Sequence, residues 1–522
     1  MSFFKQVLNG RKYLSFNHYF PLFAAAHAAC FAVTRIPYFL NYDIPGLRMA
    51  ANYYRDKIFF LLEGKLPVFE NLPALYPLFL YACNLAGFRN NDILILQCLI
   101  SLLSVAACQY LVNKYFPGYR WVFFISALIF YSSALCLNYN TRIEERSLLA
   151  DVTMLAVTFL ALGLAVGKRR FFILASLLLA LMPLLRTQCF YVVPLVGILA
   201  FVLLAKKKFI QAALLASPFV LILMISSVYN KTTFGSFFFG KYGLVVSLAK
   251  VVFYLDDGGD YSPEVKAAIK RVNDSFSEED KHTVRYSWSA KKLRKVFDIG
   301  NYDDKSGEFK TLFDTHRAEL EKLAAHSRKK NPILYLKFIY TNFIYCFLLN
   351  YDKYYFYYNE LVNRKYYIEK SKAFDYPEFT EAEYQQIYKE YTDFIRQKLP
   401  LPRSGIIGED DYVSGFADEN FFVKLNHYYQ IAHAGIFSNL LWLVMLLLTI
   451  AFSVWEMLRA RFPEAEILIL QIPLVCILFN YGVVSLTIPP LDGYVYPTKF
   501  FVYFYPLSIA CYLWMKYVKS RV

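Results

Sequence analysis

Long apolar runs without charged residues recur along this chain and constrain its fold more than any other feature. About 20 such residues let one helix cross the hydrocarbon core of a bilayer. Of the 522 residues only 19% are charged, whereas soluble domains carry about 25%. The hydrocarbon core offers no hydrogen-bond partner to backbone N–H and C=O groups, so a segment that crosses it has to bond to itself. These runs therefore predict helices. We therefore expect an all-α polytopic membrane protein, a transmembrane helix bundle with ten spans: about 19–40, 93–112, 121–138, 147–167, 171–186, 188–205, 209–229, 430–456, 464–487 and 497–516.

Basic residues orient this bundle, because lysine and arginine concentrate in cytoplasmic loops. Ten spans place the basic turns on one side: Arg11, Lys12, Lys114, Arg120, 168–170, 206–208, Arg459, Arg461 and the basic end of the chain. The net charge of +15 reflects these turns beside anionic headgroups, so nucleic acid is not expected as a partner. The other side receives 41–92, 139–146, 230–429 and 487–499. This asymmetry favours an enzyme that works at the extracytoplasmic surface.

The chain divides into three parts: a transmembrane module at 1–229, an extracytoplasmic and interfacial region at 230–429, and C-terminal transmembrane helices at 430–522. Segments 234–255 and 332–351 are apolar and aromatic but contain lysines. We expect both to be helices in the membrane interface, where lysine and tyrosine anchor well. If both span instead, the bundle has twelve spans and 256–331, expected to be a small helical insert, moves to the cytoplasm.

The first outer loop, 41–92, opens on Asp43 directly after the first span. Apolar residues then recur with helical period from Gly46 to Gly64, which predicts a helix on the membrane surface. Prolines interrupt "EGKLPVFENLPALYPLFLYACNL" (63–85), which predicts a short juxtamembrane helix rather than a span. A carboxylate at this boundary is either the cap of a helix end or a reactive group.

Four segments in this order resemble the GT-C glycosyltransferases, which include the protein O-mannosyltransferases and the lipid A aminoarabinose transferases. They are the first outer loop, "NYNTRIEERSLLADVTMLAVTFLALGLA" (138–165), "LLLALMPLLRTQCFYVVPLVGIL" (177–199) and "YPTKFFVYFYP" (496–506). The chain departs from the family at three positions. It has Leu72 where several members carry a lysine, Ala74 in place of the second proline of the motif, and Lys499 in place of the late arginine. Residues 230–429 match no pattern of the family.

The resemblance implies that a sugar is transferred from a polyprenyl-phosphate donor to an acceptor hydroxyl on the extracytoplasmic face, with inversion. The acceptor is a glycan, a lipid or a protein. Asp43 matches the family's general base, and such catalysis is typically worth about 10²–10⁴-fold. The implied location is the bacterial inner membrane, with the active site on the periplasmic side.

Further candidates surround this reaction. Glu144, Glu145 and Asp151 could supply a second carboxylate that orients the acceptor, or structural ion pairs; Asp151 lies about one turn inside the fourth span. Cations that could bind the donor phosphate are Arg186, Lys65, Lys499, Arg142 and Arg146. Tyrosines expected to line the substrate are Tyr76, Tyr494 and Tyr496. The nine cysteines lack CxxC spacing, so neither zinc nor a disulfide framework is indicated, and no cofactor is expected to be required.

Two other readings stay open. An O-antigen polymerase or ligase also works on lipid-linked sugars at the outer face, but lacks the acidic first loop. A transporter of lipid-linked glycans needs ionisable residues deep in several spans, and only Asp151 and Glu456 come near.

Overall fold

The computed structural model describes residues 19–40, 75–88, 90–140, 145–234, 247–248, 250–274, 315–348, 429, 432–433, 440–459, 465–487 and 495–518. Within these ranges every regular element is helical, as expected for an all-α fold. Five candidate residues lie outside the described residues: Asp43, Lys65, Arg142, Glu144 and Tyr494. The surface helix expected at 46–64 lies outside them as well.

Helices form at each of the expected spans. They are α2 (Tyr19–Leu40), α5 (Asn90–Tyr115), α6 (Arg120–Tyr131), α7 (Ala134–Asn140), α8 (Arg146–Val166), α9 (Arg169–Leu185), α10 (Val192–Ala205), α11 (Phe209–Phe234), α23 (Leu440–Arg459), α24 (Ala465–Thr487) and α26 (Lys499–Leu513). Four segments of them are long and apolar enough to cross a membrane: Asp92–Tyr115, Arg146–Val166, Phe209–Tyr229 and Glu466–Leu486. This supports a membrane protein, while the count of ten or twelve spans stays a prediction.

Local sequence explains where several helices end. The span expected at 121–138 is broken into α6 and α7 by a turn at Ser132 and Ser133. Gly167 ends α8 in the left-handed region, at φ +73°, which glycine adopts without strain. Arg186 ends α9 in extended backbone, and the 3-10 helix η3 (Thr187–Tyr191) follows, so the chain turns between the spans expected at 171–186 and 188–205. The short α4 (Leu75–Leu85) agrees with the juxtamembrane helix predicted from its prolines.

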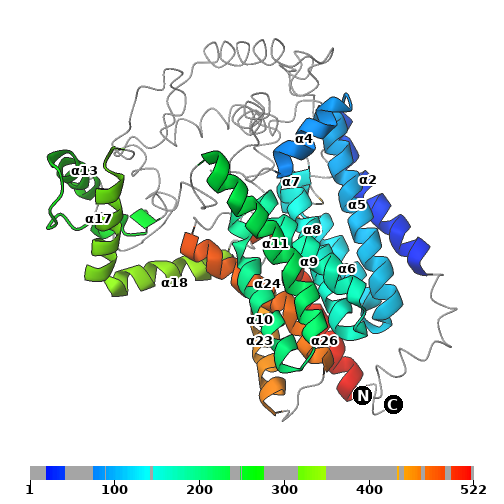
Figure 1. The fold of residues 1–522 in the computed structure, drawn as a ribbon. Coiled ribbons are helices and arrows are strands. Elements are labelled where there is room, and N and C mark those ends of the chain that lie inside the picture. The colour runs from blue at the N-terminus through cyan, green and yellow to red at the C-terminus, as the bar shows by residue number, and fades with distance from the viewer. Residues whose placement is uncertain are drawn as a thin grey trace.

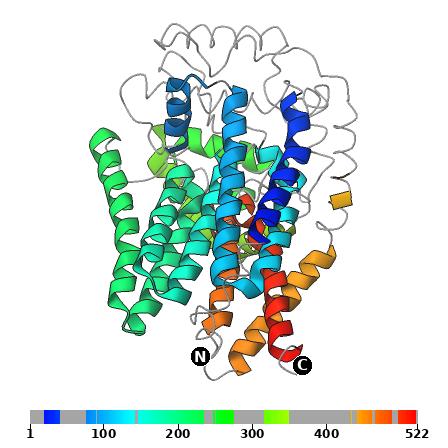
Figure 2. The same ribbon diagram turned by 90° about the vertical axis from the view of Figure 1, so that its right-hand side faces the viewer.

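The bundle has two chemically different ends. Turns with exposed basic residues join α8 to α9 and α10 to α11, and the α10–α11 turn lies at the lower end in Figures 1 and 2. We call this the basic end. The helices α4 and α7 lie at the upper end, together with the start of α8 and the end of α9. We call this the polar end, for the side chains described below.

Packing inside the bundle is close. The helix α8 contacts α5, α9 and α24, and its own residues from Ser147 to Gly163 are largely buried. At Gly163 a methyl group would meet the Phe172 ring at 3.2 Å, so glycine lets α8 and α9 approach here. One continuous apolar core runs through these helices.

A second, smaller unit lies beside the bundle. The 3-10 helix η4 (Val252–Tyr254), α13 (Pro263–Asp274), α17 (Arg317–Lys330) and part of α18 (Pro332–Leu348) enclose their own apolar core. Two polar contacts stabilise it: the Ser262 N–H donates to Glu319 Oε2 (2.8 Å), and Lys330 Nζ lies 2.7 Å from Asp256 Oδ1. This agrees with the small helical insert expected at 256–331.

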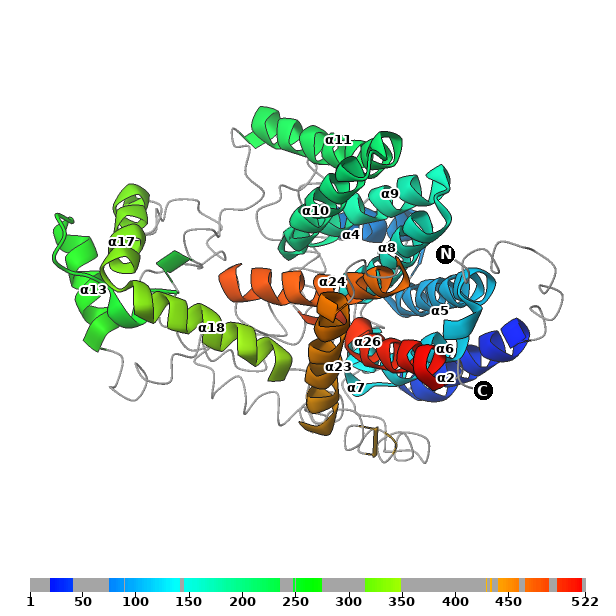
Figure 3. The ribbon, with the colours of Figure 1, turned by 90° about the horizontal axis from the view of Figure 1, so that it is seen from below.

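The two lysine-containing apolar segments differ from each other. The described end of the first, 250–255, is a turn and 3-10 helix rather than the expected interfacial helix, because Val251, Val252 and Phe253 are all buried in the small unit. Three consecutive buried side chains do not fit one face of a surface helix. The second segment does form a helix, α18, which runs across the direction of the bundle helices (Figures 1 and 3).

Candidate functional site

Buried polar side chains from five helices meet at the polar end. They are Arg35 of α2, Ser101 of α5, Tyr131 of α6, Asn140 of α7, and Ser147 and Asp151 of α8, and each is at most 1% exposed. We call these six the buried polar cluster. Polar groups are costly to bury unless they bond to one another, so such a group fixes helix positions or serves function.

Arg35 ties the end of α2 to its neighbours. Its Nη2 donates to the Asn140 side-chain oxygen (2.6 Å) and to the Tyr131 carbonyl (2.8 Å), and its Nη1 donates to Thr34 Oγ1 (2.5 Å). The guanidinium also lies 4.2 Å from the Phe31 ring centroid. The fork of donors on arginine suits several acceptors at fixed positions. Arg35 therefore fixes where α2 leaves the bundle, five residues before its last residue, Leu40.

Asp151 is satisfied inside the same cluster. The Ser101 hydroxyl donates to its Oδ2 and the Tyr131 hydroxyl to its Oδ1, both at 2.5 Å. Asn140 Nδ2 donates to Ser147 Oγ (2.8 Å) and to Ser101 Oγ (3.3 Å), and the Asn140 side-chain oxygen accepts from Arg35. Asn140 therefore connects Ser101, a partner of Asp151, to Arg35. With both oxygens engaged and 1% of the residue exposed, this carboxylate is suited to hold helices together rather than to take a proton from a substrate.

Glu145 and Arg186 form a buried ion pair between the start of α8 and the end of α9. Arg186 Nη1 donates to Glu145 Oε1, and the two side chains are only 8% and 1% exposed. The sequence suggested the donor phosphate as the partner of Arg186, and for Glu145 either the acceptor or a structural ion pair. The structure brings these two candidates together, so any anion bound by Arg186 has to compete with Glu145 or share the guanidinium with it.

The other described candidates lie near the same end. Lys499 is fully buried at the start of α26, with its Nζ 5.7 Å from the Tyr503 ring centroid. The Tyr496 ring packs against Tyr139 at a tilt of 56°, with the centroids 4.6 Å apart, and the Arg146 guanidinium lies over the Tyr139 ring at 4.9 Å. The described candidates for binding phosphate, Arg146, Arg186 and Lys499, thus come from α8, α9 and α26, which belong to segments that carried the resemblance.

Tyr76, expected to line the substrate, lies between α4 and α5. Its side chain is buried, and its hydroxyl donates to Gln97 Oε1 at 2.6 Å. This bond fixes α4 against α5. A hydroxyl occupied in this way supports the juxtamembrane helix and gives no direct evidence of a substrate contact.

Four cluster members were missed by sequence reasoning: Arg35, Ser101, Tyr131 and Asn140. Arg35 carried a usable signal, because an arginine inside a predicted span is rare and commonly functional. The three others carry no such signal, since an uncharged serine, tyrosine or asparagine looks like an ordinary residue of a membrane helix.

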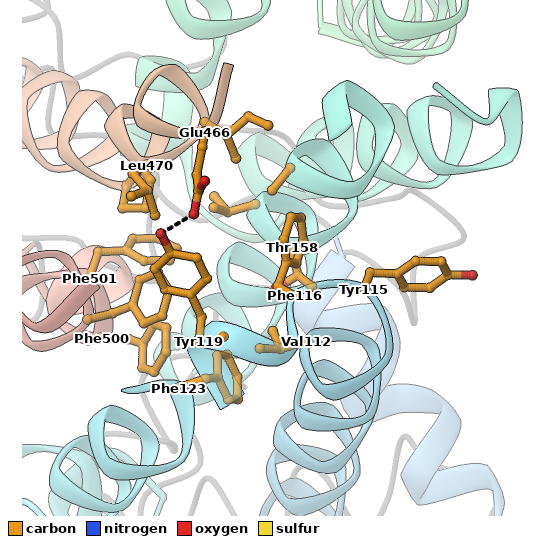
Figure 4. Close-up of a pocket in the computed structure, with 16 residues that line it drawn as sticks. Val112, Tyr115, Phe116, Tyr119, Phe123, Thr158, Glu466, Leu470, Phe500 and Phe501 are labelled. Carbon is orange, nitrogen blue, oxygen red and sulfur yellow. Dashed lines mark hydrogen bonds between the residues drawn. The ribbon is translucent and has the colours of Figure 1, made fainter. Parts of the chain in front are cut away.

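An apolar cavity lies toward the basic end (Figure 4). Its walls come from α5, α6, α8, α24 and α26: Val112, Tyr115, Phe116, Gly118, Tyr119, Phe123, Val157, Thr158, Ala161, Glu466, Ile469, Leu470, Pro473, Phe500, Phe501 and Phe504. Inside it the Tyr119 hydroxyl donates to Glu466 Oε1 at 2.5 Å. The cavity is separate from the buried polar cluster and contains no predicted site residue.

Metal ligands do not gather in the described part of the chain. Among those residues no three or more His, Cys, Asp or Glu side chains are grouped closely enough to hold an ion. All nine cysteines are free thiols, and seven of them are buried.

Comparisons with known proteins were made for the whole chain. No protein-family model, curated protein or solved structure matches it significantly. The residues of this chain and their geometry are therefore what supports a function.

Proposed function

We propose that the protein is an integral membrane glycosyltransferase of the GT-C type, which transfers a sugar from a polyprenyl-phosphate donor to an acceptor hydroxyl at the extracytoplasmic face of a bacterial inner membrane. One observation carries the proposal. Polar and cationic side chains from three of the four segments with the family resemblance converge at one end of the helix bundle, and the turns rich in lysine and arginine lie at the other. An enzyme that works on one leaflet needs this asymmetry.

The reaction needs few groups. The acceptor oxygen attacks the anomeric carbon, the bond from that carbon to the phosphate oxygen breaks, and the acceptor proton passes to a base. Phosphate leaves as a stable anion, so no strong acid is required. Cations near the phosphate stabilise its developing charge.

Asp43 is the proposed base. It follows the last residue of α2, Leu40, by three residues, and Arg35 fixes that end of α2 in the buried polar cluster. Because Asp151 is internally satisfied, it is a weaker candidate for this role than a carboxylate outside the bundle. The proposed phosphate ligands are Arg186, Arg146 and Lys499 with Lys65 and Arg142, and Tyr494 and Tyr496 remain proposed lining residues. Glu144 and Glu145 remain the proposed second carboxylates.

The experiment compares two aspartates on the purified protein in lipid nanodiscs. Asp43→Asn preserves shape and hydrogen bonding but removes the basic oxygen, whereas Asp92→Asn changes an exposed carboxylate in the first turn of α5. Transfer is measured with radiolabelled polyprenyl-phosphate sugars and membrane glycan, lipid and protein acceptors. We expect Asp43→Asn to lower turnover by about 10²-fold or more, with donor binding and folded yield unchanged, and Asp92→Asn to retain full transfer.

Two results would contradict the proposal. Turnover by Asp43→Asn above about a tenth of wild type would assign Asp43 to a helix end, since loss of a general base is worth far more than this. Absence of donor binding to the wild-type protein across the panel would reject the lipid-linked sugar as substrate.

A further inference from the structure

One face of α18 carries large apolar side chains that no described residue covers. Ile333 is 79% exposed, Leu336 is 62% exposed and Tyr340 is 66% exposed. They recur at helical spacing and so share one side of the helix. Phe338 lies on the other side and is fully buried in the core of the small unit. We call Ile333, Leu336 and Tyr340 the apolar stripe.

The apolar stripe points away from the small unit. In Figure 1 α13 and α17 lie above α18, and in Figure 3 α18 extends from them toward α23 and α24. The stripe is on the side opposite Phe338, hence opposite the unit that Phe338 packs into.

The depth of α18 follows from its contact with α24. The Phe347 ring packs against the Tyr481 ring with centroids 4.8 Å apart. Tyr481 is sixteen residues after Ala465, the first residue of α24, which is about 24 Å along a helix axis. A hydrocarbon core is about 30 Å thick. If α24 crosses from its first turn, α18 meets it close to the opposite boundary of the core.

Basic side chains border the apolar stripe. Arg328, Lys329 and Lys330 end α17, directly before α18, and Lys337 is exposed on α18 itself. Lys330 pairs with Asp256, and Arg328 lies 5.8 Å from the Tyr335 ring centroid. Among the described residues Lys329 and Lys337 have no carboxylate partner, so their charge is available to another anion.

We propose that the apolar stripe and the basic corner of α17 and α18 bind the surface of a bilayer that contains anionic phospholipid, and that this contact holds the small unit against the membrane at the polar end. Apolar side chains enter the boundary of the acyl region while lysine and arginine meet the headgroups. We favour a lipid bilayer over a protein groove as the partner because α18 lies across the direction of the spans, with Lys329 and Lys337 beside the apolar stripe.

The first experiment measures whether the stripe touches lipid. Leu336→Cys and Tyr340→Cys are labelled with bimane in nanodiscs, and Glu264→Cys, exposed on α13, is the matched control. The described native cysteines are buried or half-buried, and unsubstituted protein gives the background. Lipids brominated on the acyl chain should quench bimane at 336 and 340 and leave 264 unchanged. Equal, weak quenching at all three positions would overturn the proposal, because the stripe would then be covered by protein.

The second experiment tests the charge. Bimane at 336 should be quenched more by brominated phosphatidylglycerol than by brominated phosphatidylcholine at the same mole fraction. Each basic group near an anionic surface is worth about fivefold in local lipid preference. Lys329→Gln with Lys337→Gln should therefore abolish most of this preference, whereas Lys266→Gln with Lys270→Gln on α13 should keep it. No preference in the wild-type chain, or equal loss in both double variants, would reject the anionic-lipid site.

Discussion

The buried pair of Glu145 and Arg186 gives a sharp test of the site's electrostatics. Glu145→Gln keeps the shape of the side chain but leaves the Arg186 guanidinium, 8% exposed, without its counter-charge. Removing one partner of a buried ion pair costs about 3–5 kcal/mol, because the other charge stays desolvated. Since so little of either side chain reaches solvent, we expect a value inside this range. Arg186→Gln should cost about as much.

The double variant separates the pair from its surroundings. Glu145→Gln with Arg186→Gln removes both charges of this pair. We expect the double variant to be more stable than the sum of the two single losses predicts, with a coupling free energy of about 2 kcal/mol or more. Reversible unfolding in mixed micelles, titrated with increasing mole fraction of sodium dodecyl sulfate, measures all three. Lys168→Gln, exposed at the basic end, should change stability by less than about 0.5 kcal/mol.

The same variants report on ligand binding. Glu145→Gln removes one competitor for the Arg186 guanidinium, so polyprenyl phosphate should stabilise this variant more than it stabilises wild type, through binding to the folded state alone. Single variants that each lose less than about 1 kcal/mol of unfolding free energy, with no coupling in the double variant, would refute this prediction, because breaking a buried ion pair costs more than that. Equal stabilisation of both proteins by the lipid would remove Arg186 from the proposed phosphate ligands.

Two further predictions concern topology and pH. Cysteines introduced at 260, 375 and 410 should react with an impermeant thiol reagent from outside the cell and those at 169 and 207 should not; labelling of 260 only from the cytoplasm would establish the twelve-span arrangement. Burial, with Arg328 nearby, lowers the pKa of the Lys250 ammonium to about 8. The unfolded chain then binds more protons between this pKa and about 10.4, so the stability of the small unit should rise with pH across that window. Lys250→Met should slow hydrogen exchange in α13 and α17 at pH 7 and remove the pH dependence, with Lys266→Met as the exposed control; unchanged exchange in Lys250→Met would contradict it.

Much of the bundle was predictable because apolar periodicity and length are local properties of the chain. Each expected span contains a helix, and α9 ends at Leu185, next to the end of the span expected at 171–186. Segment 250–255 was not predictable, because whether a short apolar run forms a surface helix or enters a separate core depends on partners far along the sequence. Here those partners are α13 and α17, whose burial of Val252 and Phe253 outweighs the amphipathic alternative.

The site was predictable in its charges but not in its pairings. A carboxylate or an arginine near a span end is visible in the sequence, and Glu145, Asp151 and Arg186 do lie buried at the polar end. Their partners were not visible, because Ser101 and Tyr131 come from other helices and look like ordinary residues of a span. The partner decides the role: two hydroxyl donors turn Asp151 into a structural group, and Glu145 turns Arg186 into half of an ion pair.

These pairings bear on where a base for the proposed transfer can lie. A carboxylate that has to accept a substrate proton needs an oxygen within about 3 Å of the incoming hydroxyl. Asp151 is only 1% exposed, and each of its oxygens accepts a bond from a neighbouring helix, so an incoming hydroxyl has no open path to it. Arg35 bonds to Asn140 and Tyr131 and so anchors the end of α2, and Asp43 follows Leu40, the last residue of that helix, by three residues. An anchored helix end this close in the sequence is the feature that favours Asp43 over Asp151 as the proposed base.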